Sequence, residues 1–174
     1  MSVRQLMLEE LARGLRLIRG GGEVVPTWRI VTPDGDFVIG TRLDHDEEQQ
    51  QKLILTLVPC FMRWKMATAF VLTLETWLGL RMESGEGAVL AVGVSDAERW
   101  GVMRRIQRVP YFRFQPLEWL HADQLDDTFF TLLPSGENTV TGMEEAELVA
   151  IFGAGGVLPA KRILVGDLHL DVTL

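Results

Sequence analysis

The chain has 174 residues, about the length of one domain, and can bury enough surface to fold without disulfides or a structural metal. Its 47% hydrophobic and 24% charged residues are typical of a globular protein and exclude a disordered chain. The 17 basic and 24 acidic residues give a net charge of −7, which argues against general affinity for nucleic acid. A single cysteine, Cys60, excludes an internal disulfide and a four-cysteine metal centre.

The first part of the chain predicts a helix followed by a β-hairpin. One stripe of apolar residues recurs at helical period and comprises Leu8, Leu11, Leu15 and Ile18. This stripe predicts a helix over residues 3–19, and the three glycines at 20–22 end it. Residues 24–32 and 36–41 are rich in β-forming side chains, and Pro33-Asp34-Gly35 between them is typical of a turn.

A second helix is predicted from Asp44 to Trp64, followed by two strands. Asp44 and Glu47 have the spacing of a capping box, and the largely apolar interior of the segment indicates a buried helix. Pro59 must kink this helix or begin another, because proline lacks the backbone N–H and crowds the preceding turn. Residues 67–77 and 88–94 predict strands, and the short loop at 81–87 implies that they pair antiparallel.

The second half of the chain is less regular. Residues 95–109 fit either a helix or a strand, and the sequence leaves the choice open. Residues 111–119 are predicted to be extended but outside the sheet interior, because Pro110 and Pro116 cannot donate to a ladder. Short helices are expected at 123–133 and 141–152, and alternation over 163–174 predicts one half-buried strand.

This order of elements predicts a single α+β domain over residues 1–174. An N-terminal helix, a hairpin and a central buried helix precede a mostly antiparallel sheet, short C-terminal helices and a final strand. The N-terminus lacks the pattern of a signal peptide, and no apolar run approaches the length that spans a bilayer. We therefore expect a cytoplasmic protein of bacterial type without a membrane association.

One constellation of residues suits a divalent metal. Asp167, His169 and Asp171 are spaced two apart, so a strand would place all three on one face. Imidazole and carboxylate groups suit zinc, manganese or iron, although one strand rarely completes a site. The competing interpretation is that these residues form the wet face of an amphipathic terminal strand. No other cofactor is predicted.

Charge is segregated along the chain. A cluster of arginines with a neighbouring tryptophan comprises Arg99, Trp100, Arg104, Arg105, Arg108 and Arg113. The following residues, 114–160, contain eight acidic residues and no lysine or arginine. The arginine cluster could bind nucleic acid by charge and stacking, but the adjacent acidic stretch would repel a polyanion. A match between the arginines and the acids, within one chain or between two, explains both features.

These observations favour a non-enzymatic interaction or assembly module that self-associates, with the arginine cluster as its partner-binding residues. The alternatives are a small metal-dependent enzyme using Asp167, His169 and Asp171, and a nucleic-acid accessory protein using the arginine cluster. Cys60 lies in an apolar helical segment, which indicates a buried and inert thiol rather than a nucleophile. The glycines at 153–156 follow a predicted helix rather than precede one, which argues against a phosphate-binding loop.

Overall fold

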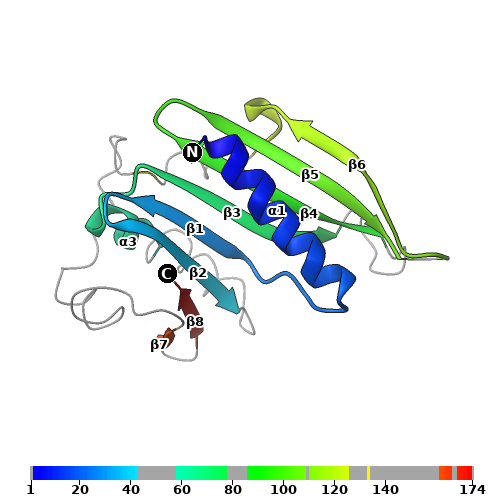
Figure 1. The fold of residues 1–174 in the computed structure, drawn as a ribbon, viewed down its shortest axis with the longest axis horizontal. Coiled ribbons are helices and arrows are strands. Elements are labelled where there is room, and N and C mark those ends of the chain that lie inside the picture. The colour runs from blue at the N-terminus through cyan, green and yellow to red at the C-terminus, as the bar shows by residue number, and fades with distance from the viewer. Residues whose placement is uncertain are drawn as a thin grey trace.

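An antiparallel sheet of eight strands is the framework of the fold (Figure 1). The computed structural model describes residues 2–42, 58–77, 86–108, 110–125, 133, 161–165 and 168–173. The helical elements are α1 (Val3–Arg19), α3 (Val58–Trp64) and the 3-10 turn η3 (Ala122–Gln124). The strands are β1 (Thr27–Thr32), β2 (Gly35–Arg42), β3 (Ala69–Trp77), β4 (Glu86–Ser95), β5 (Arg99–Gln107), β6 (Arg113–Leu120), β7 (Lys161–Val165) and β8 (Leu168–Thr173). Their order across the sheet is β6-β5-β4-β3-β1-β2-β8-β7, which confirms the predicted α+β class.

The predicted hairpin is present as β1 and β2. Thr32 pairs with Gly35, so Pro33 and Asp34 form a two-residue connection. Gly35 has a φ of 122°, a conformation that favours glycine, and the Thr32 hydroxyl donates to the Gly35 carbonyl at 2.8 Å. The first strand starts at Thr27 rather than at residue 24, because Pro26 directly before it cannot donate to a ladder.

Helix α1 covers one face of the sheet, across β3, β4 and β5 (Figure 1). The Ser2 side chain caps its first turn, and the Gly22 N–H bonds the Leu17 carbonyl at 2.9 Å to close its last turn. Its buried side packs on apolar residues of the strands, among them Val71, Val89 and Val102. Leu8, predicted within the buried stripe, is instead 39% exposed, because it lies at the edge of that stripe.

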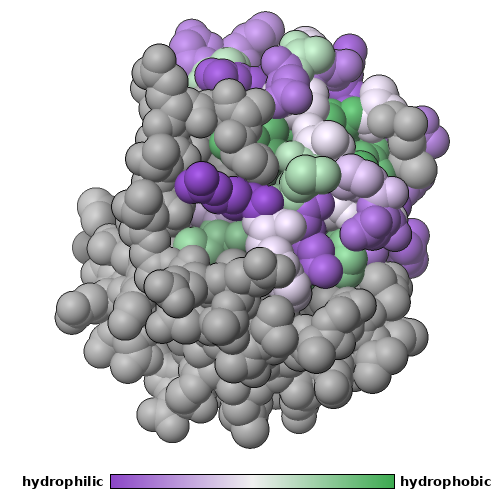
Figure 2. Space-filling view, turned by 90° about the vertical axis from the view of Figure 1, so that its left-hand side faces the viewer, coloured by the Kyte–Doolittle hydropathy of each residue, from purple (hydrophilic) through white to green (hydrophobic). Residues whose placement is uncertain are grey.

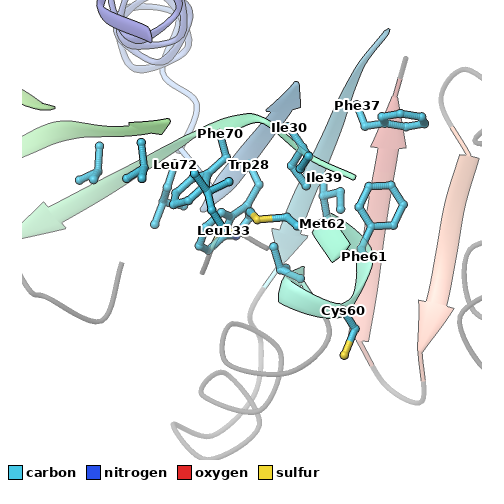
Figure 3. Close-up of a cluster of buried hydrophobic side chains, with 14 residues drawn as sticks. Trp28, Ile30, Phe37, Ile39, Cys60, Phe61, Met62, Phe70, Leu72 and Leu133 are labelled. Atoms are coloured by element: carbon cyan, nitrogen blue, oxygen red, sulfur yellow. The ribbon is translucent and has the colours of Figure 1, made fainter. Parts of the chain in front are cut away.

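On the other face of the sheet, α3 packs against residues of β1, β2 and β3 (Figure 3). Phe61 and Met62 of α3 pack in one cluster with Trp28 of β1 and Phe70 of β3. Trp28 and Phe70 contact each other with ring centroids 5.4 Å apart. Pro59 lies in the first turn of α3, where a missing N–H costs nothing, and the rest of the predicted helix, residues 44–57, lies outside the described residues.

The structure resolves the open choice at residues 95–109 in favour of a strand. Arg99–Gln107 forms β5, paired antiparallel with β4, and a tight turn in which the Ser95 hydroxyl accepts from the Glu98 N–H at 3.0 Å joins the two strands. The capping-box pattern at Ser95 therefore marks a turn rather than a helix. Residues 113–120 form β6 at the edge of the sheet, in agreement with the exclusion of Pro116 from the sheet interior.

Two predictions near the C-terminus are wrong. The α-helix expected from Asp123 is a three-residue 3-10 turn, and Leu125 already has extended backbone; residues 126–132 and 141–152 lie outside the described residues. The single strand expected over 163–174 is a pair of strands, β7 and β8, in which Val165 pairs with Leu168. Only Gly166 and Asp167 separate them, and Gly-Asp between two apolar runs is a hairpin signal.

The surface of the molecule is mixed in the view of Figure 2. Hydrophobic residues of the described part show there in separate groups among hydrophilic ones. Within the part of the chain that the structure describes, no helix combines the length and the apolar character that crossing a bilayer requires.

Candidate functional site between α1 and β6

The alternation of β5 divides the arginine cluster between the two faces of the sheet. Trp100, Val102 and Ile106 pack in the cluster that α1 covers, so the even-numbered residues of β5 face the helix. Arg104 therefore lies on the α1 side, whereas Arg105 lies on the opposite side. The six residues predicted as one partner-binding cluster do not share a single surface.

On the side of the sheet opposite α1, the arginine block meets the acidic block within one chain. The Arg105 Nε donates to the Glu118 carboxylate at 3.0 Å, and both side chains are about half exposed. Glu118 belongs to the stretch without basic residues, so this contact is an internal match of the predicted kind. An exposed ion pair adds little stability, and its main effect is to orient the two strands.

Arg108 and Arg113 are also engaged within the chain. The Arg108 guanidinium donates to the Glu75 carboxylate of β3 at 2.5 Å, and the Arg113 Nε donates to the Gln107 side chain. Glu75 in turn accepts from the Val24 N–H at 3.4 Å. These contacts fix the chain just before β6 to the middle of the sheet.

On the α1 side, Arg4 is stacked against two tryptophans. Its Cζ lies 4.4 Å from the centroid of the Trp100 ring and 4.6 Å from that of Trp119. The two rings contact each other edge to face with centroids 6.2 Å apart, and the Trp100 Nε1 donates to the Glu98 carboxylate at 3.1 Å. A guanidinium over indole faces is a favourable cation–π contact, so the first turn of α1 is anchored to β5 and β6 through rings rather than through acids.

The last turn of α1 repeats this arrangement with phenylalanine. The Arg19 Cζ lies 5.3 Å from the Phe114 ring centroid, and the Arg104 Cζ lies 5.2 Å from the same centroid. Phe112 contacts Phe114 edge to face at 5.2 Å, and the Arg104 Nε donates to the Gln115 carbonyl at 2.8 Å. The guanidinium groups of Arg19 and Arg104 therefore both contact the Phe114 ring and lie close to each other.

These residues define one surface, which we call the α1–β6 surface. Its members are Arg4 and Arg19 of α1, Trp100 and Arg104 of β5, Phe114, Leu117 and Trp119 of β6, and Phe112 just before β6.

The opposite side of α1 has a different electrostatic character. Arg29 of β1 contacts the carboxylates of Glu9 at 3.0 Å, Glu10 at 3.4 Å and Asp36 at 2.8 Å, and Arg13 contacts Glu10 at 2.8 Å. Burial lowers the pKa of Arg29, but the hydrogen bonds and attraction of Asp36, Glu9 and Glu10 outweigh it, and the net shift is upward. On that side each of these arginines is matched to a carboxylate, whereas Arg4, Arg19 and Arg104 contact no described carboxylate.

Large apolar side chains are exposed on β6 and directly before it. Tyr111 is 80% exposed, Phe112 47%, Leu117 45% and Trp119 37%. They lie on the edge strand β6 or directly before it. The edge itself is protected: Pro116 has no N–H, and Gln115 and Pro116 together lie opposite Arg105, as in a β-bulge. A partner would therefore bind this edge through side chains rather than by adding a strand.

A hollow of about 720 Å³ lies at the C-terminal end of α1 and continues the α1–β6 surface. Arg19 and Phe112 line it together with Gly21, Gly22 and the Glu75–Arg108 ion pair. Its size is within the range of ligand pockets. Two acids, Glu23 and Glu75, and two arginines, Arg19 and Arg108, are among its lining residues.

The predicted metal residues are only partly described. His169 and Asp171 lie on β8, where they pair with Arg42 and Gly40 of β2, but their side chains and the whole of Asp167 lie outside the described residues. Among the described residues, no three His, Cys, Asp or Glu side chains are grouped so that they could hold a metal. The metal site thus stays a prediction. Cys60 is buried in α3, as expected of an inert thiol.

The sequence contained a signal for the surface that composition alone did not show. Arg4 and Arg19 are 15 residues apart, about four helical turns, so both lie on one side of the helix. Phe114 is at an even position and Trp119 at an odd one, so a regular strand would place them on opposite faces of the sheet. The bulge at residues 115–116 brings both to the same face. Comparisons with family models, with curated proteins and with solved structures find no match to this chain.

Proposed function

We propose that the chain is a non-enzymatic interaction module that self-associates through the α1–β6 surface. The observation that carries this proposal is the exposure of Phe112, Leu117 and Trp119 beside arginines that contact no carboxylate among the described residues. Aromatic residues and arginine are enriched at the centres of protein interfaces, and tryptophan, tyrosine and arginine dominate binding hot spots. Stacking on the rings also holds Arg4 and Arg19 in place, which reduces the entropy lost on binding.

A second copy of the chain has the complementary charge. Acidic residues outnumber basic ones 24 to 17, and residues 114–160 carry eight acids without a single lysine or arginine. An interface that repeats itself through a two-fold axis needs both partners of each contact on the same chain. This chain has arginines on the α1–β6 surface and an excess of carboxylates elsewhere. The single cysteine also supports the proposal that the module works in the cytoplasm.

Two leucines of nearly equal exposure provide a matched test. Leu117 on β6 is 45% exposed and Leu17 on the far side of α1 is 43% exposed. We expect sedimentation velocity to show concentration-dependent association of the wild-type chain from low micromolar to near-millimolar concentration. Leu117→Gln should weaken this association, and Leu17→Gln should leave it unchanged.

The unfolding transition of each variant in urea verifies that it is folded, since exposed substitutions change stability by only about 0.5 kcal/mol. A wild-type chain that is monomeric over the whole concentration range overturns the proposal of self-association. Equal effects of the two substitutions overturn the assignment of the α1–β6 surface.

A further inference from the structure

We infer that the α1–β6 surface binds carboxylate groups, and that in the assembly these belong to the acidic stretch of a second copy. The inference rests on the proposed function, because it specifies what the surface of one copy takes from the other. It starts from the guanidinium groups of Arg4 and Arg19, which the fold places on rings and not on acids.

Within the described part of the chain, the stacking leaves the donors of both arginines unused. A guanidinium group has five N–H donors at its edges, whereas a cation–π contact occupies only its face. Arg4 contacts the rings of Trp100 and Trp119, Arg19 contacts that of Phe114, and neither has a hydrogen bond from its side chain to another residue that the structure describes. Their fork geometry matches a carboxylate, which accepts two such donors at once.

The remaining arginines show that this arrangement is particular to one side of α1. Arg13 and Arg29, on the other side of the helix, already contact Glu9, Glu10 and Asp36. Arg105 contacts Glu118, and Arg108 contacts Glu75. A chain with 24 acids has carboxylates enough for every arginine, and the charge at Arg4, Arg19 and Arg104, which no described carboxylate matches, is available to a partner.

The spacing of these charges selects an extended partner over a small anion. Fifteen residues separate Arg4 from Arg19, which along an α-helix is about 22 Å. A single phosphate or carboxylate cannot reach both ends, whereas about seven residues of extended chain span that length. In a second copy, the stretch 114–160 still has seven acids when Glu118, already held by Arg105, is left out.

The test compares two arginines of the same helical turn. Arg16 and Arg19 are both exposed and both lie in the last turn of α1, so their effects on the helix dipole are alike. Arg19→Gln, measured by sedimentation, should weaken self-association about fivefold, the effect of one ion pair, and Arg4→Gln should weaken it similarly. Arg16→Gln should have no effect, and Arg19→Lys, which keeps the charge but loses the guanidinium fork, should recover only part of the association.

Salt provides a second measurement. At about 0.15 M salt the Debye length is about 8 Å, so repulsion between two chains of charge −7 is already largely screened. Raising the salt further should therefore act mainly on the close contacts and weaken association of the wild type. It should weaken that of the Arg4→Gln, Arg19→Gln double variant less.

A labelled polyglutamate peptide separates the two proposals. We expect it to bind the wild-type chain, to compete with self-association, and to lose affinity in the double variant. Association that is indifferent to salt and to both substitutions overturns the carboxylate inference and leaves the interaction module standing. A wild-type chain that stays monomeric but binds the peptide overturns self-association alone. Tighter binding of a single-stranded oligonucleotide than of polyglutamate overturns the carboxylate assignment in favour of a nucleic acid.

Discussion

Gly93 of β4 lies where helix α1 approaches the sheet closely. A Cβ built at this position would lie 2.5 Å from the Met7 Sδ and 2.5 Å from the Val3 Cγ1. Both contacts are far inside van der Waals distance. Met7 is fully buried and Val3 is nearly so, and the branched side chain of Val3 has little rotamer freedom. Gly93→Ala must therefore push the first two turns of α1 away from the sheet.

The expected cost follows from two opposing effects. Overpacking a close-packed core typically costs about 1–3 kcal/mol. Replacing glycine by alanine at an unstrained position returns about 0.4–1 kcal/mol, because the unfolded chain loses conformational freedom. We expect a net loss of about 1–2 kcal/mol in the free energy of unfolding, measured by urea denaturation, and a fall of about 3–6 °C in the melting temperature.

Gly14 is the matched control, because it lies in the same helix–sheet interface. A Cβ there would meet Val89 at 3.1 Å, which requires a shift of only a few tenths of an ångström. Alanine is favoured over glycine inside a helix by about 1 kcal/mol, so Gly14→Ala should leave stability unchanged or raise it slightly.

A double-mutant cycle identifies the cause. Met7→Ala alone should cost about 2–5 kcal/mol through the cavity it leaves. If the methyl group of the alanine introduced at position 93 enters that space, the double variant should lose less stability than the sum of the two single losses, by at least about 0.5 kcal/mol. A Gly93→Ala variant as stable as the wild type, or fully additive losses, would refute the close approach of α1 and β4.

Two further predictions concern groups away from the α1–β6 surface. Arg29→Met should lower the free energy of unfolding by about 2 kcal/mol, because it leaves the buried Glu10 with Arg13 as its partner. This is less than the roughly 3–5 kcal/mol lost when a fully buried pair is broken. In the same urea titration, the exposed substitution Arg16→Met should be neutral. The raised pKa of Arg29 means that its contribution to stability is present at every pH below its unfolded pKa, which lies far above neutrality, and is lost only at higher pH. The difference from wild type should therefore be constant between about pH 6 and 9, and a steep change in that window would contradict this account. The buried Cys60 thiol should react with a maleimide only as fast as α3 opens, and urea should accelerate the labelling; rapid modification of the native chain would show that the thiol is accessible.

The sequence predicts the elements well where pattern and punctuation agree. Helix α1 ends at the glycines as expected, and the hairpin turns at Pro33-Asp34. Residues 95–109 could not be assigned because Ser95 and Glu98 have capping-box spacing in a turn that uses the same hydrogen bonds. Pairing of β5 with β4 on one side and with β6 on the other makes Arg99–Gln107 a strand.

The candidate site was predictable only in part. A cluster of arginines in sequence suggests one patch, but the two-residue period of β5 sends Arg104 to the α1 side and Arg105 to the other. The partners of Arg104 on the surface, Arg4 and Arg19, are about a hundred residues away in the chain. Their proximity depends on which face of the sheet α1 covers and on the bulge in β6, neither of which a local pattern specifies.

The protection of the β6 edge bears on the size of the proposed assembly. A bare edge strand would let copies add to one another without limit, but Pro116 removes a donor from this edge and the bulge opposite Arg105 distorts its ladder. In the proposed assembly, the contacts are then made by side chains on the α1 side, where arginines of one copy would face acids of the other. If each copy both gives and receives such a contact, the two surfaces satisfy one another across a two-fold axis and the assembly closes as a dimer. An open chain of copies would instead leave one set of arginines exposed at its end, and sedimentation at increasing concentration would then show species that grow without a plateau.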